Sequence, residues 1–207
     1  MRRFVCLLLI SFGGLCLISS FMAFNNSKHV VYFIPGQGSD YRIFKNLTLD
    51  TNNLDIRYID WILPNKNETM VAFAKRIAMQ IDTLKPFSLV GVSLGGMISA
   101  ELSTSFHPVK TILISSAKTR NEIPLNYKFQ KYFPINKMIP KSVIKKSALI
   151  LQPIYEKDSK QESETCRAMM NEKNPLFMKR TVNMIINWDR KEVNKSIIHI
   201  HGNNDNT

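Results

Sequence analysis

The sequence predicts an α/β fold with a mostly parallel sheet and flanking helices. Short apolar runs rich in β-branched and aromatic residues alternate with segments of helical periodicity, and two of these runs end in glycine-rich turns. Strands that alternate with helices, several of them apolar throughout, are typical of a parallel sheet covered on both faces. With 207 residues, of which 44% are hydrophobic, the chain is long enough for one sizeable core and unlike disordered or collagen-like proteins.

The predicted elements follow from the spacing of apolar residues. Strands are expected at residues 29–34, 54–61, 87–90, 111–115 and 196–201. An amphipathic helix is expected over 69–84, capped by Asn67 or Thr69, and a second helix over 94–106. Residues 118–195 differ from the rest because prolines, lysines and helical patches at 141–151 and 176–188 replace the alternating pattern. We therefore expect a core at 29–117, a helical cap inserted at 118–195, and a return to the core at 196–207.

The positive charge is concentrated in the predicted cap. The chain has a net charge of +12, and residues 118–195 contain 17 basic and 8 acidic residues, a net charge of +9. A solvated lysine-rich face is the commonest cause of such a stretch, and no nucleic-acid-binding motif accompanies it. We expect no nucleic acid partner.

The first 24 residues have the character of a membrane segment. Arg2 and Arg3 precede an uncharged run from residue 4 to residue 24, which as a helix would reach roughly 30 Å, the thickness of the hydrocarbon core. We favour an uncleaved anchor, with a cleaved signal peptide as the alternative. The arginines would then be cytoplasmic, and the rest of the chain would lie outside the cytoplasm, in the cell envelope.

The turn Gly91-Val92-Ser93-Leu94-Gly95 stands between a predicted strand and a predicted helix. In this G-x-S-x-G pattern the turn is so tight that the flanking positions must be glycine, here Gly91 and Gly95. The serine hydroxyl is then exposed at the carboxyl end of the strand, beside a helix amino terminus that favours developing negative charge. Ser93 is the candidate nucleophile.

Three motifs in order, PGQGSD at 35–40, GVSLGG at 91–96 and HGNND at 201–205, resemble the α/β-hydrolase fold family. The resemblance implies a serine hydrolase that acts on an ester or thioester through an acyl-enzyme, without metal or organic cofactor. It implies that the backbone N–H groups of Gln37 and Leu94 form the oxyanion hole. It also implies that Asp205 is the acid of the catalytic triad.

The histidine that such a triad requires is implied downstream of Asp205, where this sequence has two more residues. The positions of His29, His107 and His199 do not suit the role, and His201 is the least unsuitable substitute. We expect a hydrolase truncated at its carboxyl terminus and inactive in this form. The alternative is a non-catalytic lipid-binding protein of the same fold, whose lidded pocket holds an acyl chain or whose basic cap docks on anionic lipid. Acyl transfer to an alcohol is a further possibility that the sequence does not separate from hydrolysis.

Overall fold

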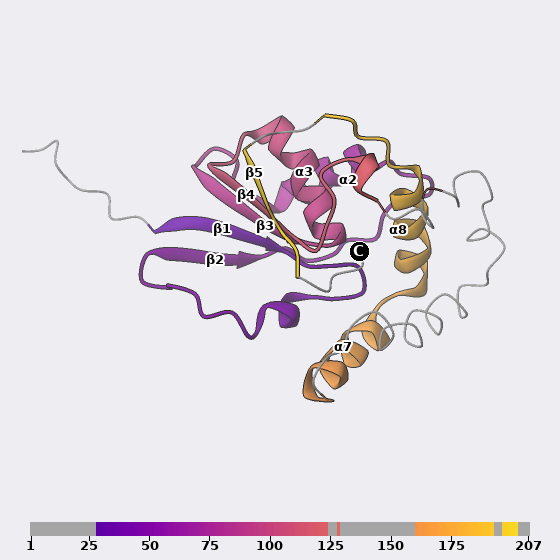
Figure 1. The fold of residues 1–207 in the computed structure, drawn as a ribbon, viewed down its shortest axis with the longest axis horizontal. Helices are drawn as coiled ribbons and strands as arrows, with labels where there is room; N and C mark the ends of the chain where they lie inside the picture. The colour runs from indigo at the N-terminus through magenta and orange to yellow at the C-terminus, as the bar shows by residue number, and fades with distance from the viewer. Residues whose placement is uncertain (1–27, 124–127, 129–159, 193–195, 203–207) are drawn as a thin grey trace, which may run out of the picture.

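The computed structural model describes residues 28–123, 128, 160–192 and 196–202, and its centre is a five-stranded sheet (Figure 1). The strand order is β2-β1-β3-β4-β5, and every neighbouring pair is parallel. The elements are β1 (His29–Ile34), η1 (Tyr41–Phe44), β2 (Leu54–Tyr58), α2 (Met70–Ile77), η2 (Ala78–Gln80), β3 (Phe87–Val92), α3 (Leu94–Phe106), β4 (Lys110–Ile114), η3 (Arg120–Glu122), α7 (Lys160–Glu172), α8 (Pro175–Asn187) and β5 (Ile197–Ile200).

The predicted parallel α/β sheet is confirmed, and so are the bounds of β1 and α3. The helical patch predicted at 176–188 corresponds to α8. Two residues fix the start of this helix: Pro175 is its first residue, and the side chain of Asn174 accepts a hydrogen bond from the N–H of Leu176. The patch predicted at 141–151 lies outside the described residues. Helix α7 was not predicted, because its sequence is mostly polar and shows little apolar periodicity.

The helix predicted over 69–84 is shorter in the structure. Thr69 caps α2 as expected, by accepting a hydrogen bond from the N–H of Ala72, but the helix gives way to η2 at Ala78. Beyond it the backbone of Ile81 is extended, and the N–H of Asp82 donates to the hydroxyl of Tyr32 on β1. This contact turns the chain toward β3, so Leu84, predicted on the apolar face, is exposed instead. Strand β2 likewise ends at Tyr58, earlier than predicted.

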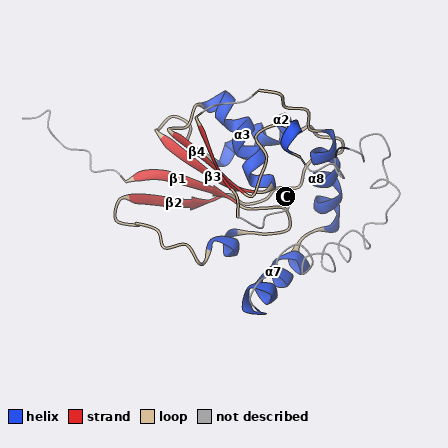
Figure 2. Ribbon diagram, viewed as in Figure 1, coloured by secondary structure: helices blue, strands red, loops and turns tan. Residues whose placement is uncertain are grey.

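The main hydrophobic core lies on one face of the sheet. Helices α2 and α3 pack there, and Figure 2 shows them on the same side. Tyr32, Leu89 and Ile98 are among its fully buried side chains, and each contributes about 1.5–3 kcal/mol by leaving water. Helix α8 extends this core with Phe177, Met178 and Met184.

On the opposite face of the sheet, the only helix among the described residues is the single turn η1. This face is therefore less covered than the sequence predicts for a sheet with helices on both faces. Phe44 of η1 packs edge-to-face on Phe33, with ring centroids 4.9 Å apart, and joins Val31 and Val90 in a small cluster. Toward β5 this face becomes more open, and Ile198 and Ile200 are exposed.

The two ends of the sheet have different neighbours. The start of β1 lies at one end, together with the turns that lead into β3 and β4. Helices α7 and α8, called the cap helices below, lie at the other end, beside the carboxyl ends of the strands (Figure 1). The proposed division into anchor, core, cap and returning core remains a prediction, because residues 1–27 and most of 124–159 lie outside the described residues.

Candidate functional site

Ser93 occupies a strained turn between β3 and α3. Its backbone has φ 50° and ψ −117°, in a region that residues with a side chain rarely adopt. It stands at the N-cap of α3, where a serine side chain usually accepts a hydrogen bond from the first turn, yet it makes no such bond. Its side chain is exposed, and no hydrogen bond to any described residue holds its hydroxyl. The hydroxyl is therefore available to another molecule.

The glycines at 91 and 95 are required by close approach of backbone atoms. A Cβ atom on Gly95 would lie 2.1 Å from the carbonyl oxygen of Ile34, and one on Gly91 would lie 2.4 Å from the carbonyl oxygen of Gly95. Neither distance is possible for a side chain, because the atoms in the way belong to the backbone. The crowding joins the start of α3 to the end of β1.

The polar groups of the Ser93 turn, residues 91–95, are bound to the neighbouring strand and helix. The N–H of Ser93 donates to the carbonyl of Ile114 on β4 at 3.0 Å, and its carbonyl accepts from the N–H groups of Gly96 and Met97. The hydroxyl of Ser116 donates to the same carbonyl at 2.6 Å. Within the described part of the chain, the N–H of Leu94 has no hydrogen-bond partner, while its side chain is buried.

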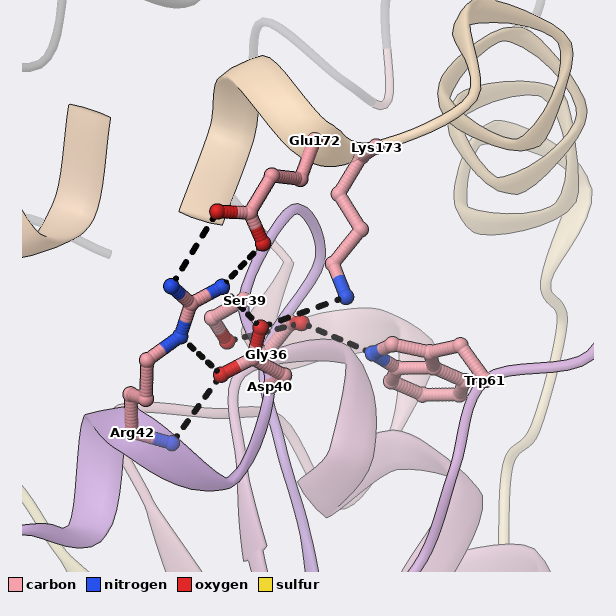
Figure 3. A network of polar contacts seen from close by, with 7 residues as sticks. All are labelled: Gly36, Ser39, Asp40, Arg42, Trp61, Glu172 and Lys173. Carbon is pink, nitrogen blue, oxygen red and sulfur yellow. Dashed lines mark hydrogen bonds and ion pairs between the residues drawn. The ribbon is translucent and has the colours of Figure 1, made fainter. Parts of the chain in front are cut away.

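A second loop, residues 35–40, follows β1 and reaches the Ser93 turn. A Cβ atom on Gly36 would lie 3.5 Å from Cβ of Ser93. The carbonyl of Gly36 accepts from the N–H and hydroxyl of Ser39, at 3.2 and 2.9 Å, and from Nε1 of Trp61 at 3.1 Å (Figure 3). In a trans peptide the next N–H points away from this carbonyl, so these bonds fix the direction of the N–H of Gln37.

The Gln37 side chain ties this loop, called the Gln37 loop below, to α8. Its Nε2 donates to Oγ1 of Thr181 at 2.6 Å and to the carbonyl of Met178 at 3.2 Å. Thr181 is fully buried, and its hydroxyl donates in turn to the carbonyl of Phe177 at 2.9 Å. A carbonyl can only accept, so the amide of Gln37 has a single possible orientation.

Ion pairs connect the same loop to the end of α7. Arg42 binds Asp40 at 2.7 Å and also binds Glu172, and Lys173 lies 3.7 Å from Asp40 (Figure 3). The hydrogen bond from Arg42 is the main cause that lowers the pKa of Asp40 below its ordinary value, and it lowers the pKa of Glu172 as well. Both carboxylates are therefore ionised at neutral pH, and the network joins the Gln37 loop to α7 by charge.

Solved structures resemble the fold of this chain. No family model matches the sequence, and no curated protein is significantly similar to it. A hydrolase from Pseudomonas aeruginosa is 14% identical with a TM-score of 0.60, over 78% of this chain and 65% of that one. MenH from S. aureus is 15% identical with a TM-score of 0.60, over 80% of this chain and 70% of that one. A lipase-esterase related protein from Clostridium acetobutylicum is 18% identical with a TM-score of 0.55, over 80% of this chain and 69% of that one.

The chain has the α/β-hydrolase fold. It spans slightly less than two thirds of the length of the first of these structures. In this hydrolase fold, the structure brings together Ser93, Leu94, Gly91, Gly95 and Gln37 at the carboxyl end of the sheet. Their catalytic roles remain predictions. The predicted acid, Asp205, lies outside the described residues.

Two histidines lie at the carboxyl end of β5. Nε2 of His199 is 2.9 Å from the carbonyl of Ser116 and 2.7 Å from Nε2 of His201. Because the carbonyl can only accept, Nε2 of His199 carries the proton, and Nε2 of His201 faces it as an acceptor. Burial lowers the pKa of His199, and the charge that His201 would carry lowers it further. Neither histidine hydrogen-bonds the hydroxyl of Ser93 in the described part of the chain.

Several residues that support this site were not predicted as site residues from the sequence. Ser116, Trp61 and Thr181 hold the backbone or side chain of predicted site residues, but each belongs to no motif. The described residues contain no group of three or more histidine, cysteine, aspartate or glutamate side chains that would suit a metal ion. No described helix is long and apolar enough to cross a bilayer, and the segment predicted as an anchor, residues 4–24, lies outside the described residues.

Proposed function

We propose that this protein is a serine hydrolase that acts on a small carboxylic ester or thioester. The observation that carries the proposal is the strained backbone of Ser93 at an N-cap where its hydroxyl makes no capping bond. A serine that only shaped the turn would use its side chain to cap the helix. A hydroxyl exposed in this way is arranged to attack an electrophile brought by another molecule.

The proposed reaction runs through a covalent intermediate. The oxygen of Ser93 attacks the carbonyl carbon, its proton passes to a base, and the tetrahedral intermediate expels the alcohol or thiol to leave an acyl-enzyme. Water then hydrolyses the acyl-enzyme and releases the acid. The N–H groups of Leu94 and Gln37 would stabilise the oxyanion, each contributing roughly 3–4 kcal/mol to lowering the barrier. Two observations support this role: the N–H of Leu94 has no hydrogen-bond partner among the described residues, and the peptide that carries the N–H of Gln37 is fixed by the bonds to the carbonyl of Gly36.

The base in this proposal is the histidine that the resemblance implies after Asp205. His199 and His201 are less suitable, because the chain of contacts from them leads to the backbone of Ser93. His199 binds the carbonyl of Ser116, and the hydroxyl of Ser116 binds the carbonyl of Ser93. These contacts support the turn from the side of β5 and leave the hydroxyl of Ser93 without a base among the described residues.

Substitution of Ser93 in the full-length protein tests the proposal. In Ser93→Ala, kcat/KM for p-nitrophenyl acetate should fall by about 10³-fold or more, because the covalent route is lost. Ser105→Ala is the matched control, an exposed serine on the last turn of the same helix, and should leave the rate unchanged. A fluorophosphonate should add its mass to the peptide that contains Ser93. Equal rates for Ser93→Ala and the unaltered protein, or no adduct at Ser93, would contradict the proposal and favour a binding protein.

A further inference from the structure

The most exposed apolar side chains of the described residues gather at one end of the molecule. Met79, Leu84 and Val109 are 85%, 95% and 61% exposed, and every other large apolar residue among the described ones is less exposed. Single exposed apolar residues are common on soluble proteins. Here Met79 and Leu84 belong to the connection between β2 and β3, and Val109 belongs to the connection between β3 and β4. Both connections return the chain to the same end of the sheet.

The strand pairing places them at the amino end of the sheet. Leu84 lies three residues before the start of β3, Val109 directly precedes β4, and Met79 belongs to η2, which completes the return from β2. The N–H of Val109 donates to the carbonyl of Phe87 at 2.8 Å, which brings the starts of β3 and β4 together. His29, the first residue of β1, lies 2.8 Å from the hydroxyl of Ser88 on β3. The chain therefore enters the sheet beside these apolar residues.

Lysines accompany the apolar residues at this end. Three lysines at this end are exposed: Lys28 precedes β1, Lys85 precedes β3, and Lys110 is the first residue of β4. Lys85 is 3.3 Å from Asp82, and Nζ of Lys28 donates to the carbonyl of Thr51. Apolar side chains flanked by lysines match the interface of a bilayer, where the former enter the acyl boundary and the latter bind phosphate groups.

The uncharged run at residues 4–24 ends a short distance before this surface. Five residue steps join Phe24 to His29, and an extended chain covers at most roughly 17 Å in five steps. A membrane anchor formed by that run would hold the amino end of the sheet within this distance of the bilayer. The cap helices lie at the far end (Figure 1).

We propose that the surface formed by Met79, Leu84 and Val109, with Lys28, Lys85 and Lys110 around it, docks on the lipid bilayer in which residues 4–24 are anchored. Strand β3, with six residues at about 3.3 Å each, then separates the bilayer from Ser93 by roughly 20 Å. The site opens away from the membrane, toward substrates in the aqueous phase. This orientation does not depend on whether Ser93 is a nucleophile.

Depth-dependent quenching in the full chain tests this orientation. The native cysteines are replaced (Cys6→Ala, Cys16→Ala, Cys166→Ser), one cysteine is introduced, and a fluorophore is attached after reconstitution into phosphatidylcholine–phosphatidylglycerol vesicles. Labels in Leu84→Cys and Val109→Cys should be quenched strongly by lipids that carry a doxyl group near the headgroup. The control is Val71→Cys, because Val71 is also exposed but lies in the first turn of α2, at the opposite end of the sheet. We expect at least threefold less quenching there.

The outcome that overturns the proposal is equal quenching at positions 71 and 84, or none at 84. A chain that does not float with the vesicles would overturn it too. Met79→Ser combined with Val109→Ser should lower the quenching of the label at position 84, because these side chains would no longer hold the surface in contact with lipid. If the anchor alone positioned the domain, this double substitution would leave the quenching unchanged.

Discussion

The two loops that meet at the site are held in different ways. The Ser93 turn is fixed by backbone contacts with the sheet, from Ile34 on one side and Ile114 on the other. The Gln37 loop is fixed in part by side chains that reach the cap helices, through Thr181 on α8 and Glu172 on α7. The position of the proposed nucleophile thus depends on the sheet and α3, whereas the position of the proposed oxyanion donor depends on the cap helices.

Among the proposed variants, Gly95→Ala should have the largest effect on stability, because it disturbs the packing of the Ser93 turn against the sheet. The added methyl group would lie 2.1 Å from the carbonyl oxygen of Ile34, so β1 and α3 must separate. We expect a loss of about 3 kcal/mol or more in the free energy of unfolding, measured by denaturant titration. Gly36→Ala is the matched control, because its methyl group meets nothing closer than 3.3 Å and should cost less than about 1 kcal/mol. Similar losses for both variants would contradict the crowding argument.

Thr181→Val tests the dependence of the Gln37 loop on the cap. The substitution keeps the shape of a fully buried side chain but removes the hydroxyl that accepts from Gln37. We expect a loss of about 1–3 kcal/mol in stability, because the amide loses a partner in a part-buried site. If the proposed function holds, kcat should also fall about tenfold with little change in KM, as expected when an oxyanion donor is displaced.

The control for that variant is Thr48→Val, at an exposed threonine whose side chain makes no hydrogen bond among the described residues. This substitution should change neither the free energy of unfolding nor kcat. A Thr181→Val enzyme with lower stability but unchanged kcat would show that the cap supports the fold without positioning the loop.

The same difference explains how much of the site could be predicted from the sequence. The Ser93 turn is recognisable because its signal is local, two glycines around a serine between a strand and a helix. The contact between Gln37 and Thr181 joins residues 144 positions apart and depends on how the cap packs. Sequence spacing carries no information on such a contact, and the same holds for Ser116, 23 positions from Ser93.

The fold shows the same limit. The five strands were predictable because short apolar runs bounded by turns, or apolar–polar alternation in the case of β2, are typical of strands. Helix α7 was not predictable, because Met169 is the only buried residue among its described side chains. The early end of α2 also follows from a distant contact, the hydrogen bond from Asp82 to Tyr32. Local pattern thus predicts the elements, while long-range contacts decide their ends.

The smallest expected effect concerns the ion pairs with α7. Glu172→Gln removes one partner of Arg42 at an exposed position, where screening by water and salt leaves little net stabilisation. The variant should therefore lower the thermal midpoint by less than Thr181→Val does, and the difference should vanish in high salt. Glu164→Gln, at an exposed glutamate of the same helix outside this network, is the charge control.

Acid should reproduce the effect of Glu172→Gln in the unaltered protein. The pKa values of Asp40 and Glu172 are lower in the folded state than in the unfolded chain, so the unfolded state binds more protons as the pH falls. The stabilisation is thus fully present above the ordinary carboxyl pKa of about 4 and is lost as the pH falls through the lowered values. Thermal midpoints between pH 7 and pH 3 should converge for the variant and the unaltered protein. Curves that stay parallel would show that the ion pairs do not couple the Gln37 loop to the cap, and that the amide of Gln37 alone makes the connection.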